Sequence, residues 1–140
     1  DFKGATLIAD YGHNPDAIRA LVQAVDAMPA QRRSVVISGA GDRRDQDITE
    51  QTQILGKAFD DVILYQDACQ RGRADGEVLA LLQQGLQGAP RTDYVTQIQG
   101  EFNAIDHALA RLTPGDLCLV LVDQVEEALE HLRRHVAGEA

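Results

Sequence analysis

Four side chains that can do chemistry fall within five consecutive positions of this sequence: Asp10, Tyr11, His13 and Asn14. The imidazole of His13 can bind phosphate, bind a metal or move a proton near neutral pH, although many loop histidines do none of these. Asn14 can cap a helix, and Pro15 fits a first helical turn, where its missing N–H is not needed. The segment therefore predicts a turn into a helix that carries ligand-binding side chains.

A second polar segment, residues 39–45, contains glycines followed by Asp42, Arg43, Arg44 and Asp45. Glycines let the backbone approach a ligand, and guanidinium groups match the geometry of carboxylate or phosphate. The two aspartates could hold the arginines in place. A solvated loop with local ion pairs would explain the same residues, so both interpretations stay open.

A third polar segment, residues 67–73, places Arg71 and Arg73 on either side of a glycine, an arrangement suited to an anion. No P-loop pattern, G-x-x-x-x-G-K-[ST], occurs in the sequence, so another part of the protein would have to hold the phosphates of any bound ATP. Cys69 and Cys118 have no metal-ligand spacing, and we predict no metal site.

Strand and helix patterns alternate along the chain and define the elements that position these segments. Apolar, β-branched runs predict strands that are buried on both faces, at residues 5–9, 34–38, 61–65, 94–98 and 117–122. The fourth run contains Thr96 and Gln97 and is expected at an edge of the sheet. Apolar side chains spaced three and four apart predict helices near residues 17–28, 46–59, 74–86, 102–112 and 125–136.

This alternation predicts an α/β fold: a single Rossmann-like, doubly wound, mostly parallel sheet of about five to six strands, flanked by about five helices. We expect residues 1–140 to form one domain. Loops that follow parallel strands emerge at the same edge of the sheet, where ligands bind in such folds. Residues 10–14, 39–45 and 67–73 should therefore share one rim, although they are distant in sequence.

The composition limits the classes of partner. The formal net charge is −9, from 13 basic and 22 acidic residues, which argues against a nucleic-acid partner. No apolar run is long enough to span a membrane, and we expect no membrane partner. The two unpatterned cysteines fit a reducing cytoplasm, with Cys118 packed as a small hydrophobic side chain. Surface positions on helices would explain His107, His131 and His135.

The first segment, Asp10-Tyr11-Gly12-His13-Asn14-Pro15, resembles the D-Y-[AG]-H-[NT]-P motif that opens the C-terminal domain of the Mur ligases. Residues 41–45 and 71–77 look most like the cyanophycin synthetase branch of that superfamily. The resemblance implies ATP-dependent amide-bond formation: ATP phosphorylates a carboxylate, and an amine displaces the acyl phosphate. In this branch, arginine is added to aspartate carboxylates of a polymer.

The resemblance also implies which side chains form the nucleotide end of the site. His13 would be the catalytic residue and would face the phosphate and acyl phosphate. Asp10 would bind the nucleotide near its ribose, and Tyr11 and Asn14 would shape the nucleotide-binding turn.

The resemblance further implies that the two arginine-bearing segments, residues 39–45 and 67–73, bind the substrate. The guanidinium groups expected to meet carboxylates of the substrate or polymer are those of Arg43, Arg44, Arg71 and Arg73. Asp42 and Asp45 would orient these arginines or attract a cationic arginine substrate.

In this superfamily, a central domain supplies the P-loop and most ligands of Mg²⁺, and the C-terminal domain closes over it. The chain begins at Asp1 without an initiator methionine, and we expect it to be a fragment of a larger ligase, inactive in isolation. Its expected partners are ATP, amino-acid and polymer substrates and the rest of the same polypeptide, and an oligomer of the full-length enzyme is left open.

Two alternatives remain. The first is a peptidoglycan-precursor Mur ligase, although the D-N-P-R motif of the branch that adds diaminopimelate or lysine is replaced here by Gln70-Arg71-Gly72-Arg73. The second is a non-catalytic α/β ligand-binding or receiver-like module with Asp67 as phospho-acceptor. Its distal lysine is missing, since Lys3 and Lys57 are the only lysines and neither is suitably placed.

Overall fold

The computed structural model describes residues 5–10, 15–37, 45–66, 77–89, 91–121, 130–131 and 133–134. In this part of the chain, strands and helices alternate as the sequence predicts. The elements, in chain order, are β1 (Thr6–Asp10), α1 (Pro15–Asp26), β2 (Arg33–Ile37), α2 (Asp45–Leu55), β3 (Asp61–Gln66), α3 (Glu77–Gly85), β4 (Tyr94–Gln99), α4 (Glu101–Arg111) and β5 (Leu117–Leu121).

The five strands form one parallel sheet in the order β1-β5-β2-β3-β4. The predicted α/β class is confirmed, and the five predicted strands agree with the observed ones to within one residue at each end. β4 lies at an edge, as its polar residues predicted. The receiver-like alternative is wrong, because flavodoxin-like folds place the first strand inside the sheet, whereas β1 here is an outer strand.

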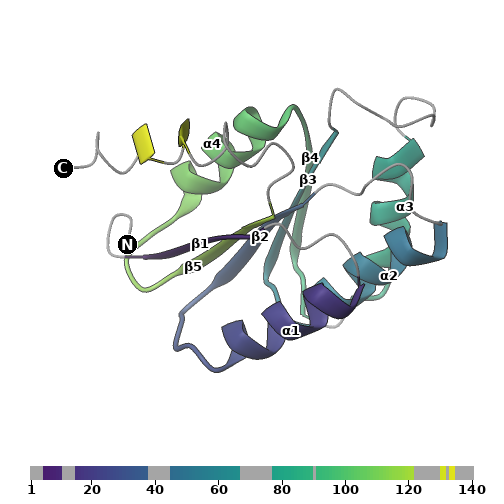
Figure 1. Ribbon diagram of the computed structural model, residues 1–140, viewed down its shortest axis with the longest axis horizontal. Coiled ribbons are helices and arrows are strands. Elements are labelled where there is room, and N and C mark those ends of the chain that lie inside the picture. The colour runs from purple at the N-terminus through teal and green to yellow at the C-terminus, as the bar shows by residue number, and fades with distance from the viewer. Residues whose placement is uncertain are drawn as a thin grey trace.

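The direction of each crossover determines which face of the sheet its helix covers. α1, α2 and α3 connect strands that progress one way across the sheet, whereas α4 returns from β4 to β5. Because such crossovers are right-handed, the two sets must lie on opposite faces. Figure 1 shows α4 on one side of the sheet and the other three helices on the opposite side.

Each face has its own apolar core. On the first face, Ile18 of α1, Ile48 of α2 and Leu82 of α3 pack in one fully buried cluster with alternate residues of the central strands. On the second face, Ile105 of α4 packs with Tyr65 and other strand residues. Continuous apolar strands thus supply both cores, as expected for a sheet covered on both sides.

Two helix predictions need correction or qualification. The helix predicted over residues 46–59 ends at Leu55, yet Phe59 is still fully buried because the turn that follows returns the chain to the core. The helix predicted over 74–86 is observed as Glu77–Gly85, and residues 74–76 lie outside the described residues. Of the predicted fifth helix, only residues 130–131 and 133–134 are described, and these are helical.

His131 is less exposed than its predicted surface position implies. Its ring stacks on Phe102 at a centroid distance of 4.7 Å, and its Nε2 lies 2.6 Å from a carboxylate oxygen of Asp106. The side chain is 21% exposed.

Cys118 is fully buried, which confirms that it packs as a small hydrophobic side chain. Among the helices described, none is long and apolar enough to cross a membrane.

Candidate functional site

The carboxyl ends of β1, β5, β2 and β3 lie side by side at one edge of the sheet (Figure 1). Asp10, the last residue of β1, is in register with Leu121, the last residue of β5, and Ile37 of β2 is in register with Leu64 of β3. The three polar segments follow β1, β2 and β3. The strands that lead into them therefore end at a common edge, as the fold class predicted.

The described structure includes two of the predicted site residues. Asp10 is exposed at the end of β1, and Asp45 is the first residue of α2. The other predicted side chains lie outside the described residues: Tyr11, His13, Asn14, Asp42, Arg43, Arg44, Arg71 and Arg73. Their roles stay predictions.

The edge contains a topological switch point at β5. The chain leaves β1 for α1 on the first face, whereas after β5 it reaches the opposite face, where His131 contacts Phe102 and Asp106 of α4. Neighbouring strands that send their continuations to opposite faces leave a crevice at their carboxyl ends, where ligands of α/β proteins bind. Asp10 stands at this position.

The end of β5 is attached on both sides. Among the described residues, the ladder between β2 and β5 runs to the pair Val36–Val120, and the ladder between β1 and β5 runs to Asp10–Leu121. The carbonyl of Leu121 accepts a hydrogen bond from the hydroxyl of Tyr65, at 3.2 Å. The end of β5 is thus fastened from the α4 side of the sheet.

The first turn of α1 is tied to α2 by ionic contacts. Arg19 donates to Asp16 at 3.0 Å and also to Glu50 of α2. Asp16 is favourably placed in the first helical turn, where the helix dipole stabilises negative charge. These contacts join the two helices that follow the first and second polar segments. Their side chains are partly exposed, so their contribution to stability is small.

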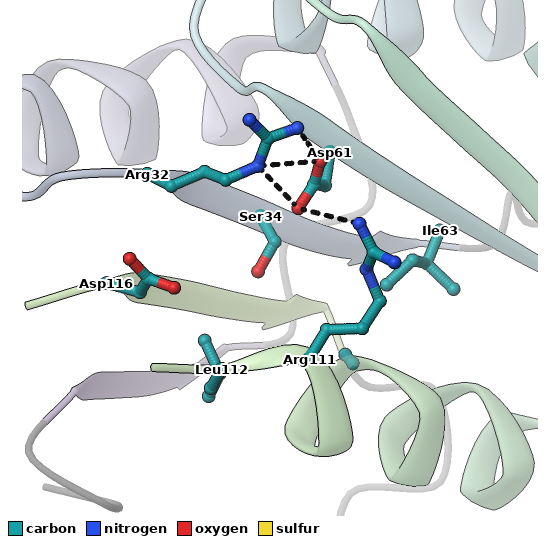
Figure 2. A pocket seen from close by; sticks show the side chains of 8 residues that line it. Arg32, Ser34, Asp61, Ile63, Arg111, Leu112 and Asp116 are labelled. Atoms are coloured by element: carbon teal, nitrogen blue, oxygen red, sulfur yellow. Dashed lines mark hydrogen bonds and ion pairs between the residues drawn. The ribbon is translucent and has the colours of Figure 1, made fainter. Parts of the chain in front are cut away.

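A polar cluster at the opposite, amino edge of the sheet was not predicted from the sequence. Arg32, just before β2, donates through Nε and Nη2 to Asp61 of β3, and through Nη2 to Asp93 at 2.5 Å. Arg111, the last residue of α4, lies 3.8 Å from Asp61 (Figure 2). Hydrogen bonds to Asp61 and Asp93 raise the pKa of Arg32 above its usual value.

The same edge carries two further contacts. The guanidinium of Arg111 lies 3.8 Å above the ring of Tyr94, whose hydroxyl is 3.0 Å from Nε2 of His107. Asp60 accepts from the backbone N–H of Arg33 at 2.9 Å and from Nε of Arg91 at 3.2 Å.

The pocket in Figure 2 is lined by the charged side chains of Arg32, Asp61, Arg111 and Asp116, and its apolar lining is Ile63, Ala108 and Leu112. Since the cations and carboxylates of this cluster contact one another, we assign the amino edge to stability. One signal in the sequence could have revealed the cluster, because charged residues precede or begin four of the predicted strands. Among the described residues, no three His, Cys, Asp or Glu side chains gather as a metal site.

Comparison with known proteins identifies the family. The family described as "Mur ligase, glutamate ligase domain" matches residues 1–124. The chain belongs to this Mur ligase family. Cyanophycin synthetase of Synechocystis sp. is 37% identical over 127 residues, which cover 90% of this chain and 14% of that protein. The 2,6-diaminopimelate-adding UDP-N-acetylmuramoyl-L-alanyl-D-glutamate ligase of Zymomonas mobilis is 31% identical over 117 residues, covering 84% of this Mur ligase domain and 23% of that protein.

Solved structures show the same fold. A UDP-N-acetylmuramoyl-L-alanyl-D-glutamate–2,6-diaminopimelate ligase superimposes with a TM-score of 0.77 at 19% identity, covering 96% of this Mur ligase domain and 30% of that chain. FolC of E. coli in complex with ADP superimposes with a TM-score of 0.70 at 25% identity, covering 91% and 29%. The domain thus spans a small part of each relative, 14% in the case of the Synechocystis synthetase.

Proposed function

We propose that this chain is the C-terminal domain of an ATP-dependent amide-bond ligase of the cyanophycin synthetase type. Such an enzyme would join arginine to aspartate carboxylates of a polymer. The observation that carries the proposal is the 37% identity to a cyanophycin synthetase along 90% of the chain. The fold supports it, because β1, β2 and β3, which lead into the three polar segments, end at the same edge of the sheet, where ligands of α/β proteins bind.

The proposed reaction has two steps. A carboxylate oxygen of the polymer takes the γ-phosphoryl group of ATP, and ADP leaves. The amine of arginine then attacks the acyl carbon, phosphate leaves with the C–O electron pair, and the amine loses a proton. Fixed cationic and N–H donors stabilise the charge that develops on the phosphoryl group and on the acyl oxygen.

The roles of individual residues follow from their positions in the motifs. Asp10 fits a nucleotide-binding role because this exposed residue ends β1 at the carboxyl edge of the sheet, and its carboxylate can accept from a ribose hydroxyl. His13 would act at the phosphoryl group, with Tyr11 and Asn14 shaping the turn.

The substrate-binding roles belong to the second and third polar segments. The arginines proposed to bind substrate carboxylates are Arg43, Arg44, Arg71 and Arg73. Asp42 and Asp45 would orient them.

The phosphates of ATP and its Mg²⁺ would be held mainly by another domain of the same polypeptide. The sequence has no P-loop pattern, and the described part of the chain gathers no metal-binding carboxylates. Residues 1–140 would then contribute one side of the site, and domain closure would exclude water from the acyl phosphate. We therefore expect the isolated domain not to hydrolyse ATP, and measurable hydrolysis would contradict this part of the proposal.

The substrate that accepts the amino acid distinguishes the two candidate ligases. Similarity to the Zymomonas mobilis ligase favours a peptidoglycan precursor as that substrate. The full-length protein should be assayed for ADP release with ATP, arginine and an aspartate polymer. A parallel assay should contain a muramoyl dipeptide and diaminopimelate. We expect ADP and amide formation only with the polymer. Activity only with the muramoyl peptide would establish the second candidate, and inactivity with both would overturn the proposal.

We also propose a cytoplasmic enzyme, since ATP is its substrate and the two cysteines show no disulfide pattern. With a formal charge of −9, we expect neither nucleic acid nor an anionic membrane surface among its partners.

A further inference from the structure

The hydroxyl of Tyr65 joins two strands, β3 and β5, that are not neighbours in the sheet. Tyr65 is fully buried near the carboxyl end of β3, on the face that α4 covers. Its hydroxyl passes the neighbouring strand β2 and donates to the carbonyl of Leu121, the last residue of β5, at 3.2 Å. A buried hydroxyl is costly without a partner, and a phenylalanine would fill the same core space without that cost.

The bond adds a further attachment to the end of β5. β5 lies between β1 and β2, and among the described residues its ladder with β2 runs to Val36–Val120. On the other side, Leu121 is in register with Asp10. The hydroxyl of Tyr65 thus joins β3 to the last residue of β5, across β2. This residue lies at the switch point, beside Asp10.

We propose that Tyr65 is a positioning residue for the ligand crevice, which fixes the carboxyl end of β5 and, through the β1 ladder, the backbone of Asp10. The inference rests on the proposed function, because it assigns Tyr65 to the site of that reaction. Tyr65 acts through Leu121 and does not itself touch a reactant. Small displacements of binding groups reduce catalysis far more than they reduce folding stability.

The test uses the full-length protein with Tyr65→Phe, which removes one hydroxyl and keeps the ring. The matched control is Thr52→Val. Thr52 is also fully buried, and its hydroxyl donates to the main-chain carbonyl of Leu82, at 2.6 Å, between α2 and α3. Both variants remove one buried hydroxyl that donates to a main-chain carbonyl, and the hydroxyl of Thr52 also lies 3.2 Å from the carbonyl of Thr49. Their thermal stabilities should therefore fall by similar amounts. Only Tyr65→Phe alters the end of β5.

Two measurements separate positioning from general loss of stability. In hydrogen–deuterium exchange, Tyr65→Phe should speed exchange several-fold at the ends of β1 and β5, whereas Thr52→Val should do so between α2 and α3. In the ligase assay, kcat/KM for ATP should fall roughly tenfold for Tyr65→Phe and stay within about twofold of wild type for Thr52→Val. Equal kinetics for the two variants, or unchanged exchange at β5 in Tyr65→Phe, would overturn the inference.

The two proposals fail in distinguishable ways. If the wild-type protein is inactive with every acceptor, the proposed function is wrong. The exchange measurement, which needs no activity, then decides alone whether Tyr65 fixes the end of β5, and protection unchanged by Tyr65→Phe overturns that role as well.

Discussion

Replacing Asp61 by asparagine tests whether the amino-edge cluster stabilises the fold. The Asp61 side chain is 7% exposed and accepts from Nε and Nη2 of Arg32, the latter at 2.5 Å. Arg111 lies 3.8 Å away on its other side. Asparagine keeps the shape of the side chain but removes the charge that both arginines face.

The expected loss of stability in Asp61→Asn follows from how deeply the paired side chains are buried. Losing the acceptor of a charge-assisted hydrogen bond costs about 1.5–3 kcal/mol, and breaking a fully buried pair costs about 3–5 kcal/mol. Arg32 is 41% exposed and keeps its bond to Asp93, so water and the second carboxylate compensate part of the loss. We therefore expect Asp61→Asn to lower the free energy of unfolding by about 2–3 kcal/mol. The melting temperature should fall by about 6–9 °C.

Asp93→Asn is the matched control, because Asp93 accepts from the same nitrogen of Arg32 at the same distance, 2.5 Å. Its side chain is 67% exposed, so the expected cost is below about 1 kcal/mol. Urea denaturation of wild type and both variants at neutral pH gives the comparison. In 1 M salt the small cost at Asp93 should nearly vanish and the larger cost at Asp61 should persist, because buried pairs are screened less. Equal costs for the two variants would refute the assignment of the cluster to stability through burial.

Three further variants test other parts of the fold. Burial raises the pKa of Cys118 to about 11, so the stability present below pH 9 should decline between about pH 9 and 11, and urea denaturation of Cys118→Ala should show a smaller alkaline decline. Burial opposes ionisation of Asp60, but the N–H of Arg33 and the guanidinium of Arg91 lower its pKa below the usual 3.8. Stability should therefore be lost as the pH falls through this range, and acid titration of Asp60→Asn by circular dichroism should show a weaker loss. Gly85→Ala would place a Cβ 2.2 Å from a carbonyl oxygen of α2, and we expect a loss of about 2 kcal/mol in urea denaturation.

The strands could be predicted because each is a continuous apolar run. A strand buried on both faces leaves this pattern whatever its neighbours are, so no knowledge of the sheet order is needed. The end of α2 was harder, because Leu55 and Phe59 have helical spacing and both are fully buried. Helical spacing reports that side chains point to one core, and a turn that returns the chain to that core satisfies it equally well.

The charged residues at the starts of the strands are visible in the sequence, but which of them pair in the amino-edge cluster could not be predicted from local patterns. Arg32 and Asp61 are 29 residues apart, and Arg32 and Asp93 are 61 apart, so they meet only because β2, β3 and β4 are neighbours in the sheet. The common edge at which β1, β2 and β3 end was predictable because parallel strands end at the same edge in any order. A rule that needs only the fold class was sufficient there, whereas contacts that depend on the strand order were missed.

The strand order adds a constraint that the motifs alone do not contain. β5 lies between β1 and β2, so the strand ends that lead into the first and second polar segments are separated by the width of one strand. We therefore expect a ligand that reaches from the end of β1 to the end of β2 to pass over the end of β5, at the carbonyl of Leu121 that Tyr65 holds. At the amino edge, Arg32 and Arg91 are paired with Asp61 and Asp60, so we expect the charge that binds such a ligand to come from the carboxyl edge. The proposed function thus assigns the charged residues of the amino edge to the fold and those of the carboxyl edge to binding.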